Sequence, residues 1–141
     1  MELIADLGGG ESMLHGDLWP ANVLFTEEGS RLRARLIDWD HAGAGPASYD
    51  ISTFISRFPR SQRRRVLRLY EGAGGQAWSD LASTAELNLL FDTHERARIV
   101  NRVIWPCIAA LEGELDWALS ELSRIDGWFR KLQPLLEEQS T

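Results

Sequence analysis

Hydrophobic and polar residues alternate strictly in one short stretch of the chain. Over residues 31–36 arginine occupies every second position, and apolar residues lie between the arginines. A short apolar run at residues 23–25 comes first, and the segment 26–30 between the two is rich in turn-forming residues, including a glycine. A period of two next to a glycine-containing turn predicts an antiparallel β-hairpin.

From residue 48 onward the apolar residues recur at the three-to-four-residue spacing of amphipathic helices. Glycines interrupt this pattern after residue 70, and Pro106 predicts a kink. The pattern predicts five helices, over residues 48–58, 61–70, 79–91, 93–112 and 114–138. The predicted fold class is therefore α+β and mostly α-helical, with a short β-hairpin on a helical body.

The composition is that of a globular domain. The chain has 141 residues, of which 44% are hydrophobic and 26% charged. This length suits one domain, so we expect a single domain over residues 1–141. The net charge of −6 argues against a general nucleic-acid binder, which needs a basic surface. No apolar run approaches the length of a membrane-spanning helix, so we expect no membrane partner.

The lone cysteine and the N-terminal residues bear on the cellular compartment. Cys107 lies in an apolar stretch, has no second cysteine to pair with, and is predicted to be a small buried side chain in a reducing compartment. The first residues lack the basic segment and apolar core of a signal peptide. We therefore expect a cytoplasmic protein.

The residues best suited to chemistry lie in two clusters. The first is His-Gly-Asp-Leu-Trp-Pro-Ala-Asn at residues 15–22, here named the motif loop, and the second is Ile-Asp-Trp-Asp at residues 37–40. Asp17 can accept the proton of an attacking hydroxyl. Asn22 and Asp38 offer the amide and carboxylate oxygens that suit Mg²⁺. Together with the phosphates of a nucleotide, these groups suffice for phosphoryl transfer.

The predicted hairpin brings the two candidate metal ligands together. Asn22 precedes its first strand and Asp38 follows its second, and antiparallel pairing places both at the same end of the hairpin. On an extended backbone Asp40 would point the same way as Asp38, as a second metal ligand or a substrate contact. The alternative is that residues 15–17 form an ordinary turn and that Asp38 is a surface carboxylate.

Residues 14–52 resemble the aminoglycoside phosphotransferase and choline kinase family, whose members are relatives of protein kinases. The order of His, Asp and Asn in the motif loop, followed by a metal-binding Asp, is similar to the H-R-D-L-x-x-x-N and D-F-G motifs of protein kinases. The start of the loop is also similar to fructosamine kinases. The Asp-Trp-Asp at residues 38–40 fits the aminoglycoside phosphotransferases better.

The resemblance implies a role for each motif residue. Asp17 would be the catalytic base, and Asn22 and Asp38 would be the magnesium ligands. Asp50, at the start of a helix, would brace the catalytic loop, in which His15 would be a structural residue. The implied cofactors are ATP and Mg²⁺, and the implied acceptor is a hydroxyl of a small molecule such as an aminoglycoside or an amino alcohol.

The chain departs from that family at its N-terminus. Complete members carry an N-terminal lobe with a sheet, a phosphate-covering loop and a lysine that grips the nucleotide phosphates. Here only fourteen residues precede the motif loop, and the only lysine is Lys131. We therefore expect a kinase-like C-terminal catalytic lobe alone, which self-associates or needs an N-lobe partner through its exposed face. The alternative is a non-catalytic binding or regulatory module.

Three further groups of residues are open to interpretation. The arginines of residues 60–68 are predicted to form a solvated helix face paired with nearby acids. Trp19 and Trp39 belong to the two clusters, flank the expected site and are candidates to line it. The other tryptophans are expected in the core or an interface, namely Trp78, Trp105, Trp117 and Trp128. In the resembling family, acidic side chains of the C-terminal helices often bind cationic substrates, and the candidates are Glu112, Glu114, Asp116 and Glu121. Surface solubility explains these acids equally well.

Overall fold

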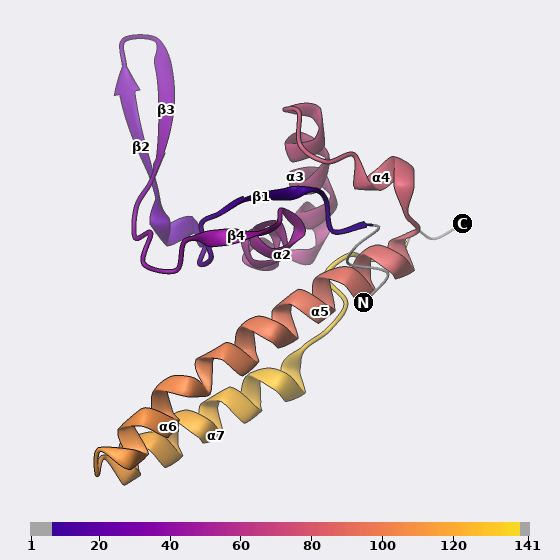
Figure 1. Cartoon of the computed structure of the whole chain (residues 1–141). Coiled ribbons are helices and arrows are strands. Elements are labelled where there is room, and N and C mark those ends of the chain that lie inside the picture. Colours follow the sequence, from indigo (N-terminus) through magenta and orange to yellow (C-terminus); the bar gives the residue numbers. More distant parts are fainter. Residues whose placement is uncertain (1–6, 139–141) are drawn as a thin grey trace.

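A computed structural model describes residues 7–138 and confirms the α+β class, with two small sheets and a largely helical body (Figure 1). The strands are β1 (Glu11–Leu14), β2 (Val23–Glu28), β3 (Arg31–Leu36) and β4 (Gly43–Pro46), with a 3₁₀ turn η1 (Pro20–Asn22) before β2. The helices are α2 (Ser48–Ser56), α3 (Arg60–Gly72), α4 (Trp78–Leu81), α5 (Thr84–Arg102), α6 (Ile104–Leu111) and α7 (Leu115–Lys131).

The predicted hairpin is confirmed as β2 and β3, which pair antiparallel with Val23 opposite Leu36. It projects away from the helices (Figure 1), and apolar side chains on it remain exposed, Phe25 by 62% and Leu32 by 66%. The second sheet pairs β1 with β4, with Leu14 opposite Gly43. The end of β1, which leads into the motif loop, therefore lies beside the start of β4, which follows the cluster at residues 37–40.

The first two helices agree with the prediction, whereas the next boundary is wrong. The helix expected over residues 79–91 is interrupted, because α4 ends before a new helix begins after Ser83. Ser83 accepts a hydrogen bond from the backbone N–H of Glu86, and the Glu86 carboxylate accepts one from the Ser83 N–H. This reciprocal capping box starts α5.

Prolines determine the remaining differences. Pro106 has no N–H to donate to the carbonyl of Arg102, four residues earlier, so the helix breaks at Val103 and α6 begins afresh. The last helix ends at Lys131 rather than at residue 138, because Pro134 disfavours a helical backbone in the residue before it.

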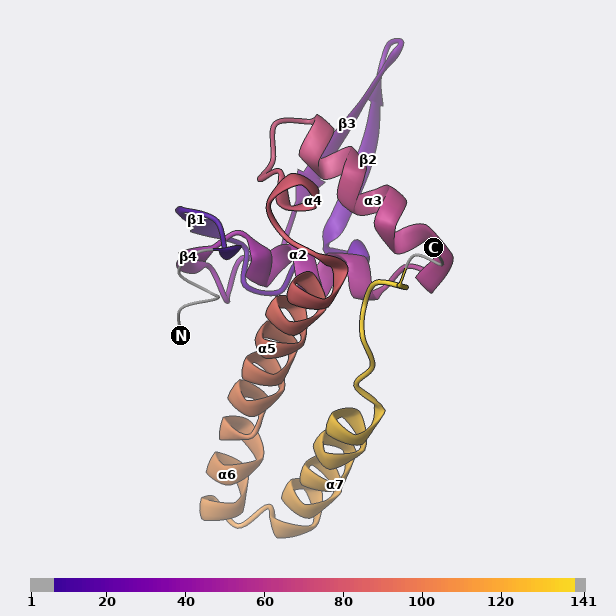
Figure 2. The ribbon, with the colours of Figure 1, turned by 90° about the vertical axis from the view of Figure 1, so that its right-hand side faces the viewer.

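The hydrophobic core lies between α2, α3, α5 and the segment after α7. Its buried members are Ile51, Ile55, Leu67, Trp78, Leu87, Leu90, Phe91, Leu135 and Leu136. Trp78 is in the core, as predicted. In contrast, Cys107 is exposed, so the burial predicted for it is wrong, and Trp105 and Trp117 are exposed and lie outside this core. These three lie on α6 and α7, which pair at the far end of an arm extending from the body (Figure 2). No helix within residues 7–138 has the length and hydropathy needed to cross a membrane.

Buried polar contacts join α2 to α5. The Glu95 carboxylate on α5 accepts hydrogen bonds from the hydroxyls of Ser52 and Thr53 on α2, each at 3.2 Å. The same carboxylate pairs with Arg98 one turn further along α5. Glu95 is only 4% exposed, so each of these partners compensates for the desolvation of its charge. The relative position of α2 and α5 is thus set by directional contacts as well as by apolar packing.

His94 makes a second such contact. Its Nε2 lies 2.7 Å from the hydroxyl oxygen of Ser48, which donates to the carbonyl of Gly8 at 2.9 Å. With its proton given to Gly8, the hydroxyl accepts from Nε2–H, and one neutral tautomer of the ring satisfies the contact. Burial lowers the pKa of His94 from its ordinary value of 6.5.

We expect His94 to make folding stability depend on pH. In the unfolded chain the ring binds a proton as the pH falls through about 6.5, while in the folded chain, where burial lowers the pKa, it binds the proton only at a lower pH. The unfolded state then binds more protons, so the free energy of unfolding decreases as the pH falls from about 7.5 to about 5.5, by at most about 1.4 kcal/mol per pH unit. Urea denaturation at both pH values measures the loss.

Two substitutions isolate the contribution of His94. His94→Gln keeps a donor for Ser48 but removes the titrating ring, and its stability should fall less at low pH than that of the unsubstituted chain. His41→Gln, which removes an exposed ring, is the matched control. An identical pH dependence for His94→Gln and the unsubstituted chain would contradict the assignment.

Candidate active site

One carboxylate holds the start of the motif loop. Asp50, in the first turn of α2, accepts a hydrogen bond from the His15 N–H through Oδ2 at 2.6 Å. It accepts a second from the Gly16 N–H through Oδ1 at 2.9 Å. Asp50 is 8% exposed, and charge-assisted bonds of this kind are stronger than bonds between neutral groups. The orientation of the loop is therefore set by α2.

His15 links the motif loop to the cluster at residues 37–40. Its ring is 2% exposed, and Nε2 lies 2.8 Å from the carbonyl oxygen of Ile37. Donation by Nε2–H leaves Nδ1 to accept from the Asp17 N–H at 3.4 Å. The ring also lies against Trp39, with the two centroids 4.7 Å apart. A single buried side chain thus contacts both clusters.

Asn22 and Asp38 lie at the same end of the hairpin, as the register requires. The Ile37 N–H donates to the Asn22 carbonyl at 3.0 Å, just beyond the last pair of the β2–β3 ladder. The side-chain amide nitrogen of Asn22 donates to the carbonyl of Asp17 at 3.0 Å. The nitrogen end of this amide is thus used inside the motif loop, and its oxygen is the atom suited to a metal.

Asp38 has an unusual backbone, with φ at +65°. Residues other than glycine rarely adopt this left-handed conformation, which costs an L-residue about 1–2 kcal/mol, although aspartate tolerates it better than most. Such strain is concentrated at functional sites, where surrounding contacts hold it in place. Here the neighbouring contacts are those of Ile37 with His15 and with Asn22.

The extended backbone expected for Asp40 is not observed. The Ala42 N–H donates to the carbonyl of Trp39 at 2.9 Å, so the segment turns immediately after Asp38. Asp40 lies in this turn and is exposed. Within residues 7–138 no three His, Cys, Asp or Glu side chains lie close enough to hold a metal ion. Asn22 and Asp38 can therefore supply only part of a coordination sphere, which suits Mg²⁺ because it retains waters and binds nucleotide phosphates.

Asp17 faces helix α5 and borders a cavity of about 450 Å³. Its Oδ1 lies 3.7 Å from Nη2 of Arg102, and its side chain is 24% exposed. Tyr49, Asn101 and Trp105 also line this cavity. Burial raises the pKa of Tyr49, with Arg98 opposing the shift, so the phenol stays protonated at neutral pH. Trp39 lines neither this cavity nor the next.

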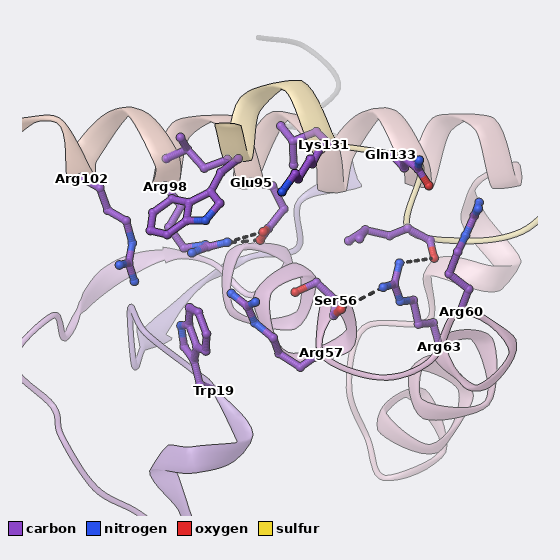
Figure 3. A pocket seen from close by; sticks show the side chains of 14 residues that line it. Trp19, Ser56, Arg57, Arg60, Arg63, Glu95, Arg98, Arg102, Lys131 and Gln133 are labelled. Atoms are coloured by element: carbon purple, nitrogen blue, oxygen red, sulfur yellow. Dashed lines mark hydrogen bonds and ion pairs between the residues drawn. The ribbon is translucent and has the colours of Figure 1, made fainter. Parts of the chain in front are cut away.

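A second cavity, of about 330 Å³, is shown in Figure 3. Arg98 and Arg102 line both the first cavity and this one. Trp19 forms one of its walls. The charged side chains around it are Arg57, Arg60, Arg63, Glu95, Arg98, Arg102 and Lys131. The sequence offered one weak signal for this grouping, the four-residue spacing of Arg98 and Arg102, which puts both on one face of α5.

Within residues 7–138 the hydrogen bonds of Arg60, Arg63 and Arg64 go to carbonyl and hydroxyl oxygens, and not to acids as the sequence predicted. Arg63 donates to the carbonyls of Phe58 and Ser56, each at 2.9 Å, and to that of Leu135 at 3.2 Å. These bonds hold the segment after α7 against the body. The acidic candidates of the C-terminal helices, Glu112, Glu114, Asp116 and Glu121, line neither of the two cavities described for residues 7–138.

Comparisons with known proteins match the part of the chain that carries these clusters. The model of a family described as the phosphotransferase enzyme family matches residues 3–87. The uncharacterized protein YcbJ of Bacillus subtilis (strain 168) is 32% identical over 73 residues, which are 52% of this chain and 23% of that relative. The chain thus spans less than a quarter of the relative's length. No solved structure matches significantly.

Gly16 occupies a position that no side chain fits. Its φ is +82°, and a Cβ built there would lie 1.9 Å from the carbonyl oxygen of His41. Gly29, in the hairpin turn, also has a positive φ, +65°, but a Cβ there would meet no atom within 4 Å. The two glycines therefore share the backbone requirement and differ in steric contact.

We expect Gly16→Ala to lower the free energy of unfolding by at least about 2 kcal/mol more than Gly29→Ala, because only Gly16→Ala forces the motif loop away from His41. Urea denaturation of both variants and of the unsubstituted chain measures the difference. Equal losses in the two variants would show that the contact with His41 does not constrain the loop.

Proposed function

The chain belongs to the phosphotransferase enzyme family, and from this premise we propose that it is a catalytic lobe that transfers the γ-phosphoryl group of ATP to a hydroxyl of a small molecule. The observation that carries the proposal is the double hydrogen bond from the motif loop to Asp50. It holds Asp17 at the edge of a cavity, while Asn22 and Asp38 meet at the base of the hairpin.

Asp17 acts on the acceptor in this proposal. Its carboxylate would accept the proton of the attacking hydroxyl while the hydroxyl oxygen forms the new bond to the γ-phosphorus and the bond from that phosphorus to the β-phosphate oxygen breaks, which releases ADP. Arg102, at 3.7 Å, keeps the carboxylate turned toward α5 and its cavity. The role requires only a small molecule that brings a hydroxyl within hydrogen-bond reach of Asp17.

Asn22 and Asp38 hold the nucleotide's metal ion. The Asn22 amide oxygen and the Asp38 carboxylate are hard oxygen donors, a set that fits Mg²⁺. When bound, ATP would supply the transferable phosphoryl group, and Mg²⁺ would neutralise the charge that develops on it. The strained backbone at Asp38 fixes the direction of its carboxylate before the ion arrives.

The proposal predicts that Mg²⁺–ATP binding depends on the charge of Asp38. We expect Asp38→Asn to weaken binding of Mg²⁺–ATP at least about tenfold in isothermal titration calorimetry, because one of the carboxylate–metal contacts is lost. Asparagine tolerates a positive φ, so the backbone is preserved. Asp116→Asn, at an exposed acid on α7, is the matched control and should bind as the unsubstituted chain does.

A second variant separates binding from chemistry. Asp17→Asn should bind Mg²⁺–ATP normally but transfer phosphate about 10²–10⁴ times more slowly, because the proton acceptor is lost. Transfer is measured as ADP release in the presence of hydroxyl acceptors. Equal heats of Mg²⁺–ATP binding to Asp38→Asn and to the unsubstituted chain would contradict the assignment of Asp38 as a metal ligand.

A further inference from the structure

The cavity beside Trp19 is strongly basic in an acidic chain. Six basic side chains and one acidic side chain line its 330 Å³, whereas the whole chain carries a net charge of −6. Helices α3, α5 and α7 and the residue just after α2 supply these side chains, so residues from four separate segments converge there (Figure 3). Like charges gathered around a cavity repel one another, and an anion inside it would relieve that repulsion.

Three of the six cations already have partners within the fold that explain their position. Arg60 donates to the carbonyl of Pro134 at 3.4 Å. Arg98 pairs with the buried Glu95, and the Glu95 carboxylate also accepts hydrogen bonds from two hydroxyls of α2. Arg63 donates to three backbone carbonyls. These contacts belong to the fold and do not depend on a ligand.

Arg57 and Arg102 are placed differently. Cζ of Arg57 lies 3.3 Å from the centroid of the Trp19 ring, and Cζ of Arg102 lies 5.7 Å from the same centroid. Figure 3 shows both side chains reaching toward Trp19, one from the residue just after α2 and one from the end of α5. Partial burial, followed by the neighbouring Arg98, lowers the pKa of Arg57, and Glu95 opposes the shift.

Two more observations point to a ligand in the same place. Nε1 of Trp19 is buried and has no hydrogen-bond partner within residues 7–138. Lys131, at the end of α7, lines the cavity from the opposite helix and adds a third cation. Guanidinium groups suit the planar, multiply hydrogen-bonded recognition of carboxylates and phosphates.

We propose that this cavity binds a carboxylate or phosphate group of the phosphoryl acceptor, so that the acceptor is a hydroxylated acid or phosphate ester. The inference rests on the function proposed above. Arg102 connects the two sites, because it lines both cavities and lies 3.7 Å from Asp17. Asn22 and Asp38, the candidate metal ligands, line neither cavity, which favours the acceptor over the nucleotide as the occupant.

The same charges argue against the acceptor that the family resemblance implied. An aminoglycoside or an amino alcohol carries ammonium groups, and these would face Arg57, Arg102 and Lys131 at close range. Like charges at an interface cost binding free energy unless they are neutralised. The residues that would bind an acidic acceptor would therefore repel a cationic one.

Four probes with one carbon skeleton test the proposal in calorimetric titrations of the whole chain at constant ionic strength. They are glycerate, glycerol 3-phosphate, glycerol and 3-amino-1,2-propanediol, which differ in the charge next to the hydroxyls. We expect the two acids to bind and the neutral and cationic probes to give no heat. Binding of glycerol or of the amine as tightly as the acids would overturn the inference.

Substitutions locate the binding. Arg57→Gln should weaken both acids at least about tenfold, because a charge-assisted contact is lost, and Arg57→Lys should recover part of the affinity. Arg96→Gln is the matched control, since Arg96 is an exposed arginine on α5 paired with Asp92, and it should change binding less than about twofold. Lys131→Gln should also weaken the acids, and it tests the site if Arg57→Gln fails to fold.

Titration of Mg²⁺–ATP into the same variants separates this inference from the proposed function. If Mg²⁺–ATP requires Asp38 and neither acid binds, the inference is overturned and the function stands. If the acids bind through Arg57 while Asp38→Asn leaves Mg²⁺–ATP binding unchanged, the anion site stands and the function falls. If Arg57→Gln weakens Mg²⁺–ATP as much as the acids, the cavity holds nucleotide phosphates and the inference is overturned.

Discussion

The hydrogen bonds from Asp50 to two successive backbone amides are the contact on which the site depends. They transfer the position of α2 to the motif loop, and α2 is itself joined to α5 through Glu95. Asp17 on the loop and Arg102 on α5 therefore belong to one mechanically connected unit. Removing a buried acceptor leaves its donors unsatisfied at a cost of about 1–3 kcal/mol each, so this arrangement is fixed more firmly than loop packing alone would allow.

The hairpin depends on the same loop for its orientation. A two-stranded hairpin is marginally stable by itself, and this one packs few side chains against the body. Its base is held instead by His15, which bonds Ile37, and by the close approach of Gly16 to His41. The exposed β2–β3 pair can thus project into solvent while Asn22 and Asp38 keep their position relative to the motif loop that carries Asp17.

The sequence predicted what depends on local patterns. Alternation identified the hairpin, and its register placed Asn22 beside the segment that leads to Asp38. Helix ends were misplaced where one residue outweighs periodicity, as with the cap at Ser83 and with Pro134. The basic cavity could not be predicted, because its cations come from four separate segments of the chain and only tertiary packing brings them around Trp19. The exposure of apolar side chains along α6 was also not predicted, since the apolar residues of an uncovered helix can have the same spacing as those of a core helix.

Net charge is a poor guide to the ligand of this chain. A total of −6 would suggest repulsion of anions, but charges on a surface are screened beyond about 8–10 Å at physiological salt. Inside a cavity the nearest groups dominate, and here Arg57 and Arg102 lie around one indole ring. Long-range charge affects the rate of encounter, whereas in the proposed site these near cations select the group that is held next to Asp17. On that proposal, the local arrangement of arginines, and not the composition of the chain, determines the chemistry of the acceptor.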